Sequence, residues 1–409
     1  MGYLKVIALA MFLPVFLPAQ LAYIPNEGCD NVSVIDLTTN TVIDSIVVGS
    51  HPQGVCVSPD GSSIYITNNW SNSVSVITAA TNAVTNTITV GEAPVGVVVS
   101  PNGDKVYVAN DIGNTVNVID VETKTVTDTI VVGAGSLCLT ISPDGSRVYV
   151  TNQGAGTVSV INTTSKTVIA TISVGLNHQG IAITPDGSRV YVAHTSGNTV
   201  SVINTATNTV MDTIVVGSSA VGVAINPDGT RVYVTSQISK TVSVIDVATN
   251  IVISTLSVGL NPGGISVHPN GKLVYVANYN SNTVSVINAL TNTVIDSVIV
   301  CTRPMALGKF IFDRIFLAAY NTIDNVPFKI LVSPIPANET VSVVCDLCEF
   351  ENSNLHITDI TGNLILTKSL NVGETNIEIN TSRLAAGVYI MFIVADQQLI
   401  KGKKIVIAH

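Results

Sequence analysis

The sequence predicts an all-β protein in which a seven-bladed β-propeller is followed by a small C-terminal β-sandwich. Three observations support this prediction: a strict internal repeat, strand-length apolar runs rich in Val, Ile and Thr within each repeat, and the loss of the repeat near residue 327. A repeat of this length is typical of propeller blades. We therefore expect a signal peptide at 1–19, a propeller at 20–326 and a separate domain at 327–409.

The composition indicates sheets that are buried on both faces. Hydrophobic residues make up 46% of the 409 residues, and charged residues only 11%. Beyond the N-terminus no apolar run reaches the roughly 18 residues that a helix needs to cross a bilayer, so we expect no transmembrane span in the mature chain. The net charge of -9, with 18 scattered Lys and Arg, argues against nucleic acid as a partner.

The first residues have the pattern of an export signal. Lys5 precedes an apolar stretch at 6–17, and Pro18 and Ala19 follow it. A basic start, a short apolar segment and a small residue are typical of a cleaved signal peptide. We expect cleavage after Ala19 and a protein that leaves the cytoplasm.

A tyrosine recurs every 42 residues and marks seven repeats. The tyrosines are Tyr23, Tyr65, Tyr107, Tyr149, Tyr191, Tyr233 and Tyr275. Each repeat contains four short runs in which β-branched residues dominate, for example 180–183, 190–193, 199–203 and 209–217. Four antiparallel strands per repeat form one propeller blade.

The first two runs of a repeat are joined by Pro-Asp-Gly or Pro-Asn-Gly, which favours a tight hairpin turn. These turns begin at Pro59, Pro101, Pro143, Pro185, Pro227 and Pro269. A degenerate seventh unit runs from 305 to 319, while the mature chain starts inside a unit. We infer seven blades, closed by pairing the C-terminal innermost strand with the N-terminal strands. Tyr23 and Leu317 then compete for one second-strand position.

These repeats resemble the YVTN family of β-propeller repeats. The name of the family is spelled at 149–152, and its wider pattern recurs at 198–203 and 258–264. The resemblance covers about residues 21–320 and implies the propeller fold. It implies function only loosely, because similar propellers occur in surface-layer and cell-surface proteins, in lactonases and in haem or quinone enzymes.

From residue 327 the repeat gives way to short alternating strands with turn signals at the spacing of a β-sandwich. A Pro-x-Pro opening, an Asp-x-x-Gly turn, a Leu-x-x-Gly-x-Tyr strand and a basic last strand are formed by Pro334, Pro336, Asp359, Gly362, Leu384, Gly387, Tyr389, Lys403 and Lys404. Their order resembles the C-terminal sorting domain of the type IX secretion system, with Ile335 where that family usually has Asn. The resemblance implies the type IX secretion machinery as a partner. It also implies delivery to the cell surface or the outside of a Gram-negative bacterium.

One face of a propeller carries the loops that enter each blade and the loops between its second and third strands. This face, the mouth, is the default ligand site. The second-to-third-strand loops begin at Asn26, Asn68, Asn110, Asn152, His194, Ser236 and Asn278. A ring of amides would suit a cation or a sugar, but Asn also stabilises turns through its own side chain, and we favour that structural role.

Departures from the repeat are the better candidates for function. Trp70 is the only tryptophan, and in a mouth loop it would suit carbohydrate stacking, a protein contact or simple packing on the next loop. His178 and His194 would lie on the same face as a weak metal signal. The candidate ligand-binding residues are Trp70, Asn68, Asn110, Asn152, His178, His194, Asn278 and Arg303.

Signatures of covalent haem, phosphate loops and nucleophile elbows are absent from the sequence, so we expect no cofactor. The first hypothesis is a non-catalytic exported protein that binds a polysaccharide or a surface protein. Two alternatives stay open: a lactonase-like enzyme with a channel cation near Glu27, Glu92 and Asp111, and a structural component of a surface layer. We expect three of the cysteines to be small core residues. These are Cys56, Cys138 and Cys301.

Overall fold

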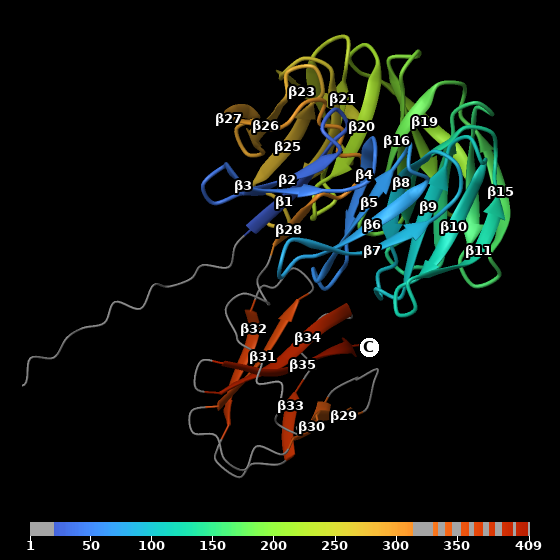
Figure 1. The fold of residues 1–409 in the computed structure, drawn as a ribbon. Coiled ribbons are helices and arrows are strands. Elements are labelled where there is room, and N and C mark those ends of the chain that lie inside the picture. The colour runs from blue at the N-terminus through green and yellow to red at the C-terminus, as the bar shows by residue number, and fades with distance from the viewer. Residues whose placement is uncertain are drawn as a thin grey trace, which may run out of the picture. The chain divides into compact units, whose positions relative to one another are not determined.

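The computed structural model describes residues 20–313 and seven strands between 330 and 407. The chain divides into two compact units, of which one is Gln20–Asp313 and the other contains Arg314–His409 (Figure 1). All regular elements in the described ranges are strands. The expected signal peptide at 1–19 and the competing Leu317 lie outside the described residues.

Seven four-stranded antiparallel sheets form the first unit and confirm the predicted propeller. From the innermost to the outermost strand, blade 1 contains β28 (Ile311–Asp313), β1 (Gln20–Asn26), β2 (Asn31–Asp36) and β3 (Thr41–Val47). Blade 2 contains β4 (Pro52–Val57), β5 (Ser63–Asn68), β6 (Ser73–Thr78) and β7 (Ala83–Thr89). Blade 3 contains β8 (Pro94–Val99), β9 (Lys105–Asn110), β10 (Thr115–Asp120) and β11 (Thr125–Val131).

The other four blades repeat this order without a break. Blade 4 contains β12 (Ser136–Ile141), β13 (Arg147–Asn152), β14 (Thr157–Asn162) and β15 (Thr167–Ser173). Blade 5 contains β16 (His178–Ile183), β17 (Arg189–His194), β18 (Thr199–Asn204) and β19 (Thr209–Val215). Blade 6 contains β20 (Ala220–Ile225), β21 (Arg231–Ser236), β22 (Thr241–Asp246) and β23 (Ile251–Ser257). Blade 7 contains β24 (Pro262–Val267), β25 (Leu273–Asn278), β26 (Thr283–Asn288) and β27 (Thr293–Ile299).

The core lies between neighbouring sheets. The second and third strands are buried along nearly their whole length, whereas the outermost strands are largely exposed. The repeated tyrosine packs across the gap between blades: Tyr107 of blade 3 belongs to a cluster with Leu139 and Val148 of blade 4. Burial on both faces explains the near-continuous apolar runs.

The innermost strands approach one another so closely that glycine is required at their contacts. A Cβ added at Gly264 would lie 1.9 Å from the carbonyl oxygen of Ala306, and one at Gly180 would lie 2.1 Å from that of Val221. Such distances are well inside van der Waals contact. In three blades a threonine joins the strands: Thr235 Oγ1 accepts from the backbone N–H of Gly222 and donates to the carbonyl of Gly263.

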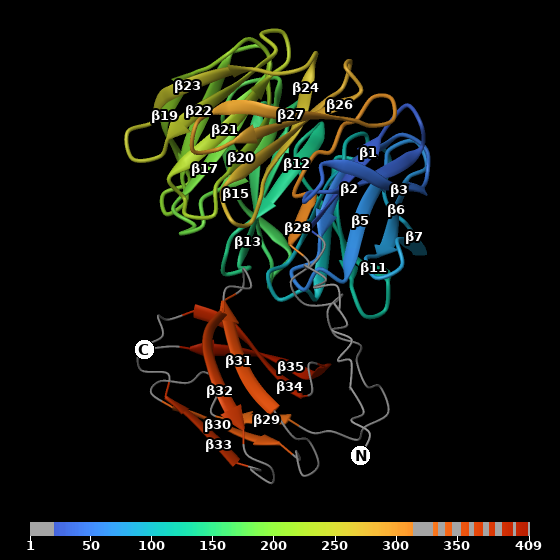
Figure 2. The same cartoon turned by 90° about the vertical axis from the view of Figure 1, so that its left-hand side faces the viewer.

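The two ends of the propeller meet in blade 1. Strand β28 pairs antiparallel with β1, in the register Gln20↔Asp313 and Ala22↔Ile311, as predicted for closure (Figure 2). Strand β1, with Tyr23, therefore occupies the second-strand position. The closing pair is short, so the ring depends on further contacts at this seam.

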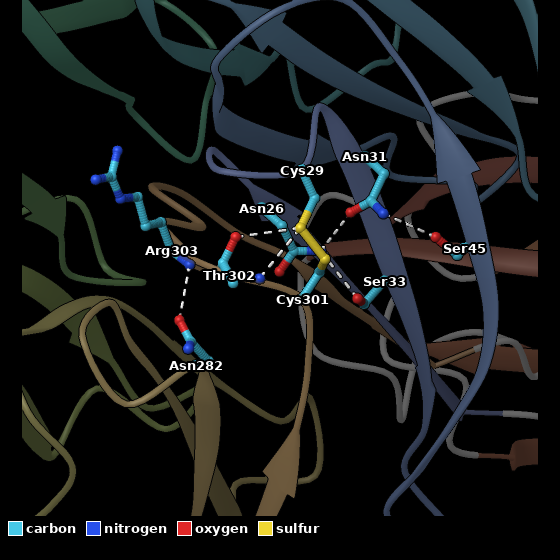
Figure 3. Close-up of a disulfide and its surroundings, with 9 residues drawn as sticks. All are labelled: Asn26, Cys29, Asn31, Ser33, Ser45, Asn282, Cys301, Thr302 and Arg303. Carbon is cyan, nitrogen blue, oxygen red and sulfur yellow. Dashed lines mark hydrogen bonds between the residues drawn. A yellow bond between two sulfur atoms is a disulfide. The ribbon is translucent and has the colours of Figure 1, made fainter.

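A disulfide between Cys29 and Cys301 reinforces the seam (Figure 3). Its two cysteines are 272 residues apart in sequence and their Cα atoms are 6.3 Å apart. The prediction that Cys301 is a small core residue is therefore wrong: β27 ends at Ile299, and Cys301 lies in the loop that follows, where it is bonded to Cys29. Cys56 and Cys138 are buried and free, as that prediction required.

The second unit is a small β-sandwich of a three-stranded and a four-stranded antiparallel sheet. The first sheet contains β29 (Ile330–Ser333), β30 (Thr340–Cys345) and β33 (Asn376–Asn380). The second contains β32 (Leu364–Leu370), β31 (Ser353–Asp359), β34 (Gly387–Ala395) and β35 (Gln398–Ile407). Buried residues alternate along the strands, as Leu355 and Ile357 do on β31.

The second sheet brings the sorting motifs together. Asp359 on β31 is the register partner of Tyr389 on β34. Lys403 and Lys404 on β35 pair with Met391 and Ile390 of β34, the strand that Gly387 begins. Four motif residues lie outside the described residues; they are Pro334, Pro336, Gly362 and Leu384.

Removal of the ring-closing disulfide should lower the free energy of unfolding by about 2–5 kcal/mol, because the bond closes a very long loop. The measurement is the guanidinium midpoint of the double variant Cys29→Ser/Cys301→Ser against the wild type, with and without reductant. Reductant should shift the wild-type midpoint to that of the variant and leave the variant unchanged. Equal midpoints for the oxidised wild type and the variant would show that closure does not need the bond.

Gly264→Ala should lower the free energy of unfolding by roughly 2–4 kcal/mol, because its methyl group meets a backbone carbonyl that cannot move alone. The matched control is Gly263→Ala, since a Cβ there lies 3.5 Å from its nearest neighbour, an ordinary contact. Chemical denaturation of the two variants separates the cases. Similar stability of both would contradict the requirement for close approach.

Candidate binding site at the ring-closure seam

The mouth loops are joined by a repeated cycle of backbone hydrogen bonds. In the loop that enters blade 1, the backbone N–H of Arg303 donates to Asn282 Oδ1 of blade 7 at 3.0 Å, and the Arg303 carbonyl accepts from Glu27 N–H at 2.9 Å. In the loop that enters blade 2, the N–H of His51 donates to Asp30 Oδ1 at 2.8 Å, and its carbonyl accepts from Asn69 N–H at 3.0 Å. Each mouth loop is thus fixed by its backbone.

The residue at the centre of each entering loop has a left-handed backbone. These residues are His51, Ala93, Gly135, Asn177, Ser219, Asn261 and Arg303. Gly and Asn adopt this conformation readily, whereas His and Arg do so at a cost. At φ of 52° and 57°, His51 and Arg303 are held by the surrounding hydrogen bonds. Strained residues of this kind cluster at functional sites.

Five side chains form a continuous row across the seam from blade 7 to blade 2; we call it the seam row. Its members are Tyr279, Arg303, Glu27, His51 and Trp70. The rings of His51 and Trp70 are stacked, with centroids 3.3 Å apart and planes inclined by 10°. The side chain of Trp70 is 69% exposed, so His51 covers one face of the indole and solvent reaches the other.

The polar members of the seam row are coupled. His51 Nε2 lies 3.7 Å from the Glu27 carboxylate, and the Arg303 guanidinium carbon lies 5.9 Å from the centre of the Tyr279 ring. Burial raises the pKa of Tyr279, and the hydrogen bond to Glu27 and the charge of that carboxylate raise it further. Tyr279 therefore remains a neutral hydrogen-bond donor at physiological pH.

The asparagines that begin the second-to-third-strand loops do not present a ring of amides to the mouth. Asn68, Asn110, Asn152 and Asn278 are fully buried. Each side-chain amide donates to polar groups five and seven residues ahead on its own hairpin; Asn68 Nδ2, for example, donates to Ser73 Oγ at 3.1 Å and to Ser75 Oγ at 2.9 Å. The amides stabilise the second-to-third-strand loops from within the fold, so they are not part of the surface that a ligand would contact.

His178 and His194 come together on blade 5, but they too are buried. Their ring centroids are 5.8 Å apart in an edge arrangement. His178 Nδ1 and Nε2 lie 2.8 and 2.9 Å from the carbonyl oxygens of Gly175 and Thr157, and His194 Nε2 lies 2.9 Å from Ser201 Oγ. Burial lowers the pKa of His178. Because these ring nitrogens are hydrogen-bonded within the protein, we interpret the two histidines as structural residues that stabilise one mouth loop.

The centre of the ring holds only a small apolar cavity, with a volume of about 50 Å³. Its lining consists of glycines and aliphatic residues of the innermost strands together with Cys138. Pockets for small organic ligands are typically several hundred Å³ and contain convergent polar groups. Within the described ranges, Glu27, Glu92 and Asp111 are not part of any cluster of three side chains suited to a metal.

Of the residues predicted for the site, the structure brings Trp70 and Arg303 into the seam row. The sequence analysis considered Glu27 near a channel cation without linking it to Trp70, and it missed Tyr279. One signal was available: alignment of the repeats puts Tyr279 where blade 2 has Asn69 and blade 4 has Gln153. Cys29 and Cys301, which form the disulfide, indicate the same seam.

Comparisons with known proteins agree with this architecture. The YNCE-like beta-propeller family matches residues 18–103 and 100–189, and the family described as lactonase, 7-bladed beta-propeller matches residues 209–302. Residues 331–408 match the secretion system C-terminal sorting domain. A PE-PGRS family protein of Mycobacterium tuberculosis, PE_PGRS18, is 52% identical over 42 residues, which is 10% of this chain and 9% of that protein. The aligned segment has the length of one repeat.

Two solved structures share the propeller fold. Hydrazine synthase of Kuenenia stuttgartiensis is 24% identical with a TM-score of 0.62, over 70% of this chain and 99% of that one. A functionally unknown protein from Desulfotomaculum acetoxidans is 15% identical with the same TM-score, over 72% of this chain and 98% of that one. At these identities the likeness concerns the fold alone.

The fold and the matched families define an exported β-propeller protein. The sorting domain directs it through type IX secretion to the cell surface or the outside. The chain therefore combines a propeller, whose first repeats match the YNCE-like beta-propeller family, with a C-terminal type IX secretion sorting domain. In the part of the chain that the structure describes, no helix has the length and apolar character needed to span a membrane.

The buried His194 should make stability depend on pH. Burial, and then the charge of His178, lower the pKa of His194 from 6.5 to about 4. Between these values the unfolded chain binds a proton that the folded chain does not. Stability is therefore fully present above pH 6.5 and falls, by up to about 3 kcal/mol, as the pH drops to about 4.

The test compares the free energies of unfolding of the wild type and His194→Asn at pH 7 and pH 4.5. Asparagine is the residue of most other blades at this position, so the variant should fold. It should lose less stability on acidification than the wild type. Equal losses would mean that His194 is not held neutral by burial.

Proposed function

We propose that this protein is a non-catalytic binding protein of the cell surface, which holds a polysaccharide chain on the mouth face at the seam row. The single observation that carries the proposal is the indole of Trp70, stacked on His51 and open to solvent on its other face. A fixed aromatic face of this kind suits the apolar face of a pyranose ring. Its rigidity reduces the entropy that binding costs.

The surroundings of Trp70 support a sugar ligand. Glu27, Tyr279 and Arg303 supply hydrogen-bond donors and acceptors beside the aromatic platform, which suits a hydroxyl-rich molecule. The mouth surface of the opposite blades carries Thr195, Gln237 and other small or uncharged side chains at the equivalent positions. The central cavity is too small and apolar to compete as the ligand site.

A lactonase-like enzyme and a structural component of a surface layer remain weaker proposals. An enzyme with a channel cation needs several oxygen ligands around the metal. The lining of the central cavity offers glycines, aliphatic side chains and Cys138 instead. For a surface-layer role, the exposed outer strands supply surface but no specific partner.

Trp70→Ala should weaken polysaccharide binding by about tenfold or more, because it removes the aromatic contact that the proposal places at the centre of the site. The matched control is Ile238→Ala, which removes a side chain that is 74% exposed at the equivalent position of blade 6. The measurement is retention of the full chain on a panel of polysaccharides in affinity electrophoresis. If the two variants behave alike, or if the wild type retains none of the glycans, the proposed function is wrong.

A further inference from the structure

The fold does not require the charge of Arg303, a member of the seam row. Its backbone is held by Asn282 and Glu27, while its side chain leads away from the disulfide (Figure 3). The equivalent loops of blades 5 and 7 have Asn177 and Asn261 in the same left-handed conformation. The turn itself is therefore satisfied without a guanidinium.

The positive charge of Arg303 is not neutralised by an ion pair in the described parts of the chain. The ion pairs found there join His51 to Glu27, Lys105 to Asp120 and Lys166 to Asp128. Tyr279 contacts the guanidinium through its ring and shares a side-chain hydrogen bond with it, and the remaining N–H groups of Arg303 are available to a ligand. On a chain of net charge -9, this is a locally cationic feature on an otherwise acidic protein.

The acidic groups beside Arg303 already have partners. Glu27 faces His51 and accepts a hydrogen bond from Tyr279. The Asp30 carboxylate accepts from the backbone N–H of His51 and the hydroxyl of Ser50. A ligand at the seam row therefore meets one exposed cation and two carboxylates that are engaged within the protein.

We propose that the polysaccharide bound at the seam row is acidic, with a sugar ring stacked on Trp70 and a carboxylate of the same chain bound by Arg303. The inference rests on the proposed function and adds the ligand class. The planar guanidinium matches a carboxylate with two parallel hydrogen bonds, which a hydroxyl cannot reproduce. The contacts Trp70–His51, His51–Glu27, Glu27–Tyr279 and Tyr279–Arg303 make the row continuous, so an extended chain of several sugar units spans it.

The general acidity of the protein gives this arrangement selectivity. A polyanion is repelled by much of the surface, and within the seam row it is attracted where Arg303 stands. A neutral glycan gains the stacking on Trp70 and neutral hydrogen bonds, but no charge-assisted pair with the guanidinium. The expected signature is a preference for the charged form of one and the same polymer.

The experiment compares polygalacturonate with its fully methyl-esterified form, which has the same sugar chain without the charge, in affinity electrophoresis with the full-length protein. Dextran sulfate serves as a third probe for sulfate in place of carboxylate. The variant is Arg303→Asn, which installs the residue of blades 5 and 7. The matched control is Lys240→Asn, which removes an exposed mouth-face cation from blade 6 and installs the residue that stands at this left-handed position in blades 2, 3, 5 and 7.

The wild type should bind polygalacturonate about tenfold more tightly than the ester. Arg303→Asn should weaken binding of polygalacturonate far more than binding of the ester and so abolish this preference, whereas Lys240→Asn should keep the preference. Equal binding of both polymers by the wild type, equal losses in the two variants, or stronger binding of dextran sulfate than of polygalacturonate would overturn the acidic-sugar inference. In those cases a Trp70-dependent interaction with the ester would still support the proposed function. If the wild type binds none of the three polymers, both fail.

Discussion

Backbone contact between the innermost strands is the constraint on which the rest of the molecule depends. Seven sheets close around an axis only if their inner edges meet, and at Gly180, Gly222 and Gly264 they meet so closely that no side chain fits. The threonine bridges between neighbouring blades, such as that of Thr235, hold this contact. The centre is filled by backbone and aliphatic side chains and has no room for a substrate. A ligand is therefore expected to bind at the mouth.

At the mouth, the backbone conformation of the loops does not depend on the side chains at their tips. A backbone hydrogen bond from the second-to-third-strand loop to the entering loop recurs in every blade, and buried asparagines support it in five of the seven, whatever side chain stands at the tip. The tips are therefore free to differ, and on blades 7, 1 and 2 they carry aromatic and charged groups. A rigid scaffold that presents variable groups is the usual basis of a precise binding surface. Among the entering loops, the scaffold accepts a strained left-handed backbone at His51, Ala93, Ser219 and Arg303.

The fold could be predicted from the sequence because the same pattern of strands and turns recurs seven times. The pairing of β28 with β1 follows from where the repeats start and stop. The site was predictable only in part. Trp70 and Arg303 stand out as departures from the repeat, but Tyr279 and Glu27 become neighbours only through closure of the ring. The role of the Asn68 amide was ambiguous in the sequence, because asparagine suits both a ligand-binding ring that faces the channel and a buried hydrogen bond within the hairpin. The signal for the buried role is the pair of hydroxyl residues Ser73 and Ser75, five and seven residues ahead, which accept its hydrogen bonds.

The position of the closing strand along the chain has a consequence for biogenesis. Blade 1 is begun first and finished last, so its first strands keep an open edge until β28 and Cys301 have been synthesised. The sorting domain at 331–408 is synthesised later still. A chain that ends before residue 313 therefore lacks both the closing strand of the propeller and the sorting domain, so a truncated propeller carries no signal for type IX secretion.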